Sequence, residues 1–219
     1  MSIFSRVLAF FGNKKHSRGG SARGFTLIEL LAVTAIIVII TLVLLLRQSS
    51  FDSSTILRSL GYSVALSVRQ TQVYGTSVLG TSTPSGVVYA SAYGLYFSSG
   101  SPSSYILFAD LNGDGIYNPS TETIKVFSLS PGYTISDVCA KLPSGKNVCS
   151  GAYDNAGYST GTMTILFKRP DPDAIFRTDS GEEDYVSGYI QVESADGITR
   201  SVLVTSAGQI DVQAPGILP

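Results

Sequence analysis

The chain has 219 residues, of which 15 are Lys or Arg, 16 are Asp or Glu, and one is His. Residues 25–219 hold 10 basic and 16 acidic residues, so their formal charge is 10 − 16 = −6, which argues against bulk nucleic-acid binding. The two cysteines have no zinc-site spacing, and no histidine follows His16 to complete such a site.

Residues 1–24 are basic and precede a long apolar run. They contain no acidic residue and five basic ones: Arg6, Lys14, Lys15, Arg18 and Arg23. The 22 residues of 25–46 include a single charged side chain, Glu29, and match the roughly 20 residues that a helix needs to cross a bilayer. The basic flank is expected to stay in the cytoplasm. A secretory signal peptide has a shorter apolar core, about 7–15 residues, and is cut after that core.

Glu29 is the unusual residue of this run. A carboxylate in a membrane helix costs about 2.5–3.5 kcal/mol on insertion scales, so it needs either a cationic or hydrogen-bonding partner or contact with water. One interpretation is a carboxylate at the membrane edge that reaches the headgroups. The alternative depends on the residues around it.

Those residues read Gly24-Phe25-Thr26-Leu27-Ile28-Glu29-Leu30-Leu31. The motif resembles the prepilin signature of type IV pilins and type II secretion pseudopilins. The resemblance implies that a prepilin peptidase cuts between Gly24 and Phe25 and that Phe25 is methylated. Glu29 would then be the fifth residue of the mature chain. The new α-amine offers a cationic partner for such a carboxylate, in a pairing between neighbouring subunits.

The same resemblance implies the function. We expect a structural subunit of a type IV pilus or of a type II secretion-like filament. It would be anchored in the plasma (inner) membrane, with the C-terminal part outside the cytoplasm. Its partners would be the prepilin peptidase and other subunits, contacted through their N-terminal helices, with no nucleic acid. The alternative is a filament-tip subunit for binding, adhesion or DNA uptake. Removal of the leader would remove His16, which excludes Ser-His and Cys-His nucleophiles, so we expect no enzyme.

The apolar run is predicted to continue as one helix to about Tyr74, where Gly75 ends it. Residues 47–75 form its amphipathic half, because apolar side chains recur there at helical spacing: Ile56, Leu57, Leu60, Val64, Ala65 and Val68. This stripe is expected to pack against the domain that follows. Gly61 is expected to weaken the helix by about 1 kcal/mol relative to Ala.

Residues 76–219 are predicted to form a β-rich head, which makes the fold class α+β. Short β-type runs alternate with turn signals. The expected strands are Ser77–Leu79, Gly86–Ala90, Tyr93–Phe97, Tyr105–Ala109, Thr123–Leu129, Tyr133–Val138, Thr162–Lys168, Ser187–Glu193, Arg200–Thr205 and Gln209–Val212. The last two form a hairpin about residues 206–208. Residues 169–184 hold prolines and carboxylates and are expected to form a solvated acidic loop rather than a glycosidase acid pair.

This succession is similar to the minor pseudopilins of the H type and to the FimT-like proteins. The residues that carry the similarity are the helix end at 60–75, Tyr93–Phe97, Tyr105–Asp110, Arg200–Val204 and Gly208–Ile210. In that family the soluble part is β-rich and packs on the helix.

Cys139 and Cys149 are expected to lie outside the cytoplasm, where disulfides persist. A bridge between them would close a short loop and contribute about 2–3 kcal/mol. Two free thiols are the alternative.

Residues 110–122 resemble the first part of a calcium loop. Oxygen-bearing side chains occupy positions 1, 3, 5 and 9, Gly115 is at position 6, and the carbonyl of Ile116 would serve position 7. The candidate ligands are Asp110, Asn112, Asp114, Ile116, Asn118 and Glu122. Position 12 is Thr121, so the final carboxylate comes one residue late. An ion-free hairpin loop rich in Asn, Asp and Gly fits the same residues.

Overall fold

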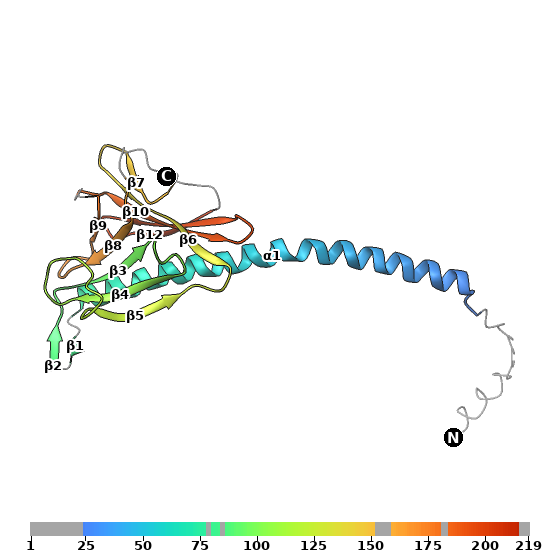
Figure 1. Cartoon of the computed structure of the whole chain (residues 1–219), viewed down its shortest axis with the longest axis horizontal. Helices are drawn as coiled ribbons and strands as arrows, with labels where there is room; N and C mark the ends of the chain where they lie inside the picture. Colours follow the sequence, from blue (N-terminus) through green and yellow to red (C-terminus); the bar gives the residue numbers. More distant parts are fainter. Residues whose placement is uncertain (1–23, 78–79, 84–85, 152–158, 181–183, 215–219) are drawn as a thin grey trace, which may run out of the picture. The chain divides into compact units, whose positions relative to one another are not determined.

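Figure 1 shows the computed structural model of the chain. It describes residues 24–77, 80–83, 86–151, 159–180 and 184–214. The expected leader therefore lies outside the described residues, apart from Gly24. The chain divides into two units, Met1–Leu46 and Arg47–Pro219. The elements are one N-terminal helix followed by β-strands, which agrees with the predicted α+β class.

Helix α1 spans Leu27–Thr76, 50 residues. Its N-terminal part, Leu27–Leu45, is long and apolar enough to cross a membrane, with a mean hydropathy of 2.9, and none of it is buried within the chain. The helix continues past Gly75, where the sequence predicted its end, and stops one residue later.

The strands form two five-stranded sheets and a separate hairpin. Sheet B has the order β5-β4-β3-β8-β9, and its strands are β3 (Ala92–Ser98), β4 (Ser104–Asp110), β5 (Thr123–Ser128), β8 (Thr162–Phe167) and β9 (Ala174–Thr178). Sheet C has the order β12-β11-β10-β6-β7, and its strands are β6 (Tyr133–Lys141), β7 (Asn147–Cys149), β10 (Ser187–Ser194), β11 (Thr199–Thr205) and β12 (Ile210–Gln213). The hairpin pairs β1 (Gly80–Thr83) with β2 (Gly86–Tyr89). All neighbouring strands are antiparallel.

The chain changes sheet three times. It builds β3 to β5 in sheet B, moves to sheet C for β6 and β7, returns for β8 and β9, and ends with β10 to β12 in sheet C. As a result β8 pairs with β3, and β10 joins β6 to β11.

Most of the predicted strands are present, with ends shifted by a few residues, and the expected hairpin joins β11 to β12. Three strands were not predicted: β1, β7 and β9. Strand β9 lies within the expected acidic loop, so that prediction was wrong for Ala174–Thr178. Ser77 belongs to no strand, and residues 78–79 of the strand expected there lie outside the described residues.

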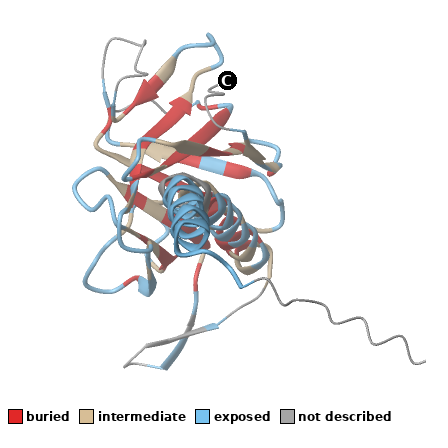
Figure 2. Ribbon diagram, turned by 90° about the vertical axis from the view of Figure 1, so that its right-hand side faces the viewer, coloured by how far each residue is buried: buried red, intermediate tan, exposed pale blue. Residues whose placement is uncertain are grey.

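One core joins the second half of α1 to both sheets. Leu57, Val64 and Val68 are fully buried and belong to the same cluster as Phe97 of sheet B and Val202 of sheet C. Figure 2 shows buried residues along the central strands of both sheets. The helix stripe was therefore predicted correctly at its centre. Its start was not, because Ile56 is 42% exposed.

Two glycines of α1 mark close approaches. A Cβ on Gly75 would lie 2.3 Å from the carbonyl oxygen of Phe167, so β8 backbone occupies the space of a side chain there. A Cβ on Gly61 would lie 3.2 Å from Cγ1 of Val212 on β12. Gly61 thus gives room to a neighbouring strand, a role that helix propensity alone does not suggest.

Candidate functional site

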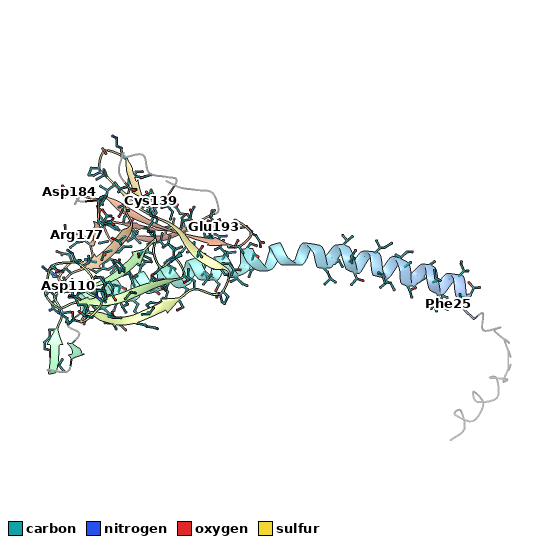
Figure 3. The ribbon with its side chains drawn as sticks, in the orientation of Figure 1. Phe25, Asp110, Cys139, Arg177, Asp184 and Glu193 are labelled. Atoms are coloured by element: carbon teal, nitrogen blue, oxygen red, sulfur yellow. A yellow bond between two sulfur atoms is a disulfide. The ribbon has the colours of Figure 1, made fainter. Side chains whose placement is uncertain are left out.

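The Gly24–Phe25 bond lies just before α1, in backbone that is not helical. Gly24 is exposed, a Cβ there would meet no atom within 4 Å, and the Phe25 side chain is 78% exposed. Figure 3 labels Phe25 at the start of the helix. Within the described residues, nothing covers the bond at which the sequence motif places cleavage.

Thr26 caps the helix. Its Oγ1 accepts a hydrogen bond from the Glu29 N–H at 3.3 Å, and its carbonyl accepts one from the Leu30 N–H at 3.1 Å. Thr-x-x-Glu is the spacing of a capping box, of which only the Thr26 half forms among the described residues. The sequence analysis missed this cap. A carboxylate in the first turn is also favoured by the helix dipole, by about 0.3–1 kcal/mol.

The Glu29 carboxylate is exposed, and no described residue donates a hydrogen bond to it. The apolar side chains around it, such as Ile28 at 73% and Leu30 at 60%, are equally exposed. In a bilayer or a helix bundle this carboxylate would therefore need a donor from another molecule.

The loop between β4 and β5 is held by its own acidic side chains. Asp110 ends β4, is 2% exposed, and accepts bonds from the N–H of Gly113 at 2.7 Å and of Gly115 at 3.2 Å. Glu122 is also 2% exposed and accepts from the N–H of Leu111 at 3.1 Å and of Asn118 at 2.9 Å. Gly113 and Gly115 have φ of 82° and 73°, which glycine adopts without strain.

Three of the other expected calcium ligands also accept hydrogen bonds from backbone N–H groups of the loop. Asn112 Oδ1 accepts from the Asp114 N–H at 3.1 Å, Asp114 Oδ1 from the Ile116 N–H at 2.8 Å, and Asn118 Oδ1 from the Ser120 N–H at 3.2 Å. These oxygen donors suit calcium chemically. However, among the described residues Asp110, Asp114 and Glu122 do not form a group close enough to share one ion. Calcium binding therefore stays a prediction, and it requires these carboxylates to come closer together than they are here.

Cys139 and Cys149 are bonded to each other, as the sequence predicts. They lie directly opposite on β6 and β7, and both are buried. The bridge therefore fastens the short edge strand β7 to the sheet.

Asp137 lies two residues before Cys139, on the same face of β6, and the sequence analysis missed it. It is 4% exposed, and its Oδ1 accepts a bond from the Ser150 hydroxyl at 2.8 Å. Its Oδ2 is buried with no partner among the described residues. Burial raises the pKa of Asp137, and the hydrogen bonds from Ser150 offset part of that rise. The carboxylate lies within 4.8 Å of both sulfurs, but as a disulfide these do not ligate a metal ion.

Asp179 is exposed and lies in the turn after β9, as expected of the solvated acidic segment, but it also has a structural role that was not predicted. Its carboxylate accepts bonds from the Thr160 hydroxyl and from the Gly161 N–H, the latter at 2.8 Å. It thereby ties the end of β9 to the start of β8. Asp171, Asp173 and Asp184 are exposed, and Glu182 and Glu183 lie outside the described residues.

No protein-family model, curated protein or solved structure matches this chain.

Proposed function

We propose that this chain is a subunit of a filament of the type IV pilus or type II secretion kind, made as a precursor and cut after Gly24. The observation that carries the proposal is the order of three features. An exposed Gly24–Phe25 bond comes first, and a helix segment with no buried residue, Leu27–Leu45, follows it. The first turn of that segment carries Glu29, whose carboxylate has no hydrogen-bond donor among the described residues.

Each feature has a physical role in this function. The apolar segment holds the precursor in the plasma membrane, with its basic flank in the cytoplasm and the β-rich part outside. After cleavage the same apolar surface packs against the helices of other subunits. The α-amine of Phe25 in one subunit then neutralises Glu29 in its neighbour, which removes the cost of a lone carboxylate among apolar helices.

Intact-mass spectrometry of the protein from membranes tests the processing. In cells with an active prepilin peptidase we expect a chain of 195 residues that begins with N-methylated Phe25, since 219 − 24 = 195. In a peptidase-deficient strain the chain should keep all 219 residues, apart from routine removal of Met1. A chain that keeps its first 24 residues in peptidase-positive cells would reject the proposal.

The variant Glu29→Gln removes the charge while keeping a residue type that suits this helix position. Glutamine serves the third position of a capping box as glutamate does, but it carries no charge. We expect Glu29→Gln to insert and be cut normally but to enter filaments poorly. Thr34→Val, a change at another exposed position of the same helix segment, is the control and should assemble normally. Normal incorporation of Glu29→Gln would reject the charge pairing.

A further inference from the structure

The outer face of sheet B carries a second, smaller apolar cluster away from the main core. Side chains alternate along β3, so Leu95 and Phe97 join the main core while Tyr96 lies on the opposite face. Tyr96 packs there with Phe108 and with Tyr117 of the 110–122 loop. Gly94 makes room for this cluster, because a Cβ there would lie 2.6 Å from the Phe108 ring.

The 110–122 loop folds across this outer face. The Tyr117 ring lies 4.9 Å from the Tyr96 ring, centroid to centroid. A Cβ on Gly115 would lie 3.8 Å from both Arg177 of β9 and Leu166 of β8. Figure 3 labels Asp110, at the start of the loop, and Arg177 at the same end of the β-rich part.

A groove remains between the loop and the end of β9. Ile116 and Tyr117 line it on the loop side, Arg177 and Asp179 on the β9 side, and Tyr96 and Thr164 form part of its floor. It encloses about 470 Å³, counting the space open to solvent. The part that a water-sized probe can enter is about 190 Å³, less than the range of about 300–1,000 Å³ that is common for small-ligand sites, so the groove would enclose only part of a ligand.

The floor of the groove contains hydroxyl groups without protein partners. Thr164 is 6% exposed, yet its hydroxyl bonds to no described residue, and the hydroxyls of Tyr96 and Thr162 also have no partner there. Nearby hydroxyls are all paired: Tyr117 with Thr123, and Thr178 with Tyr185. The Thr164 oxygen is reached by solvent through the groove, so water or a ligand hydroxyl can bond to it there.

The lining favours an uncharged, hydroxylated ligand. Arg177 and Asp179 carry opposite charges, and the Asp179 carboxylate is already bonded to Thr160 and Gly161. A nucleic-acid strand would need a track of basic side chains. We propose that this groove binds a neutral saccharide, with one sugar ring against Tyr96 or Tyr117 and its hydroxyls bonded to Thr162 and Thr164. This inference does not depend on filament assembly.

Titration of the full-length protein with defined sugars tests the proposal. The protein is kept in a zwitterionic detergent without a sugar headgroup, because glycoside detergents would compete for the groove. The probes are neutral tetrasaccharides of glucose, galactose, mannose and N-acetylglucosamine, and isothermal calorimetry measures their affinity. We expect at least one to bind, and Thr164→Val to weaken it about three- to tenfold, the change expected for one lost hydrogen bond.

Two controls keep the result interpretable. Thr134→Val changes an exposed threonine on β6 of sheet C and should bind like the wild type. Thr164→Val removes a hydroxyl that has no protein partner, so its melting temperature should not fall. No binding of any of the four probes up to 10 mM, or equal binding by Thr164→Val and wild type, would overturn the proposal. Tighter binding of single-stranded DNA than of the sugars would do so as well.

Discussion

The same substitution at two glycines of α1 should change stability in opposite directions. Gly→Ala inside a helix gains about 0.8–1.0 kcal/mol from helix propensity alone. At Gly75 the new Cβ would lie 2.3 Å from the Phe167 carbonyl oxygen and 2.7 Å from its carbonyl carbon, and backbone of a central strand cannot move away easily. Overpacking costs about 1–3 kcal/mol, and this contact lies at the upper end, so Gly75→Ala should destabilise by about 1–2 kcal/mol net.

Gly61→Ala is the matched control. Its Cβ would lie 3.2 Å from Cγ1 of Val212, a side chain on the edge strand β12 that can shift by a few tenths of an ångström. The propensity gain should therefore dominate, and stability should stay level or rise by up to about 1 kcal/mol.

Near-ultraviolet circular dichroism of tyrosine in detergent-solubilised full-length protein is the suitable assay. The chain has 12 Tyr and no Trp, and every tyrosine lies after residue 61, so the signal reports on the C-terminal unit alone. A gap of about 2 kcal/mol between the variants corresponds to about 4–8 °C in melting temperature. Equal melting temperatures, or a Gly75→Ala protein more stable than the wild type, would refute the packing argument.

Three further predictions concern the loop, the buried carboxylate and the disulfide. If the 110–122 loop binds calcium with a Kd of about 1 mM, then about 10 mM calcium should stabilise the protein by about 1.4 kcal/mol. Asp114→Asn should reduce that gain in stability. An equal melting temperature with and without calcium would reject the site. Folding raises the pKa of Asp137, so the folded state binds more protons than the unfolded state between pH 3.8 and the raised value. Stability should therefore fall as pH rises through that interval. Asp137→Asn should abolish this part of the pH dependence, and an unchanged profile would contradict it. Replacing Cys139 and Cys149 together by serine should cost about 2–3 kcal/mol in urea unfolding, because a short closed loop is released. A loss under 1 kcal/mol would show that strand pairing alone holds β7.

Local sequence patterns predicted the parts of the fold that depend on local signals. Strands such as β3 and β8 are apolar runs bounded by turn residues, and they appear close to their expected limits. Strand β9 was missed because prolines and carboxylates surround it. It forms because it pairs with β8 and places Phe176 in the core, and neither cause can be read from nearby residues.

Among the candidate sites, too, the features that depend on neighbouring residues were predictable and those that depend on distant partners were not. The Gly24–Phe25 motif, the cysteine pair and the 110–122 loop were recognisable as residue patterns. The role of Asp179 was not, because its partners are 17 to 19 residues away. Asp137 could have been found, since its spacing of two from Cys139 places both on one face of a strand. The groove on sheet B required the folded loop and could not be inferred from the sequence.

The exchange of strands between the sheets has a consequence for biosynthesis. The hairpin of β6 and β7 is synthesised before β10, the described strand that pairs with the other edge of β6 and that begins about 40 residues later. Strand β3 likewise cannot pair along its second edge until β8 has been synthesised. A nascent polypeptide emerging from a ribosome or a translocon therefore cannot complete sheet B until residue 178 is available, or sheet C until residue 213 is available. Folding should consequently be late and all-or-none, and a product truncated before β10 should be a target for proteases and chaperones.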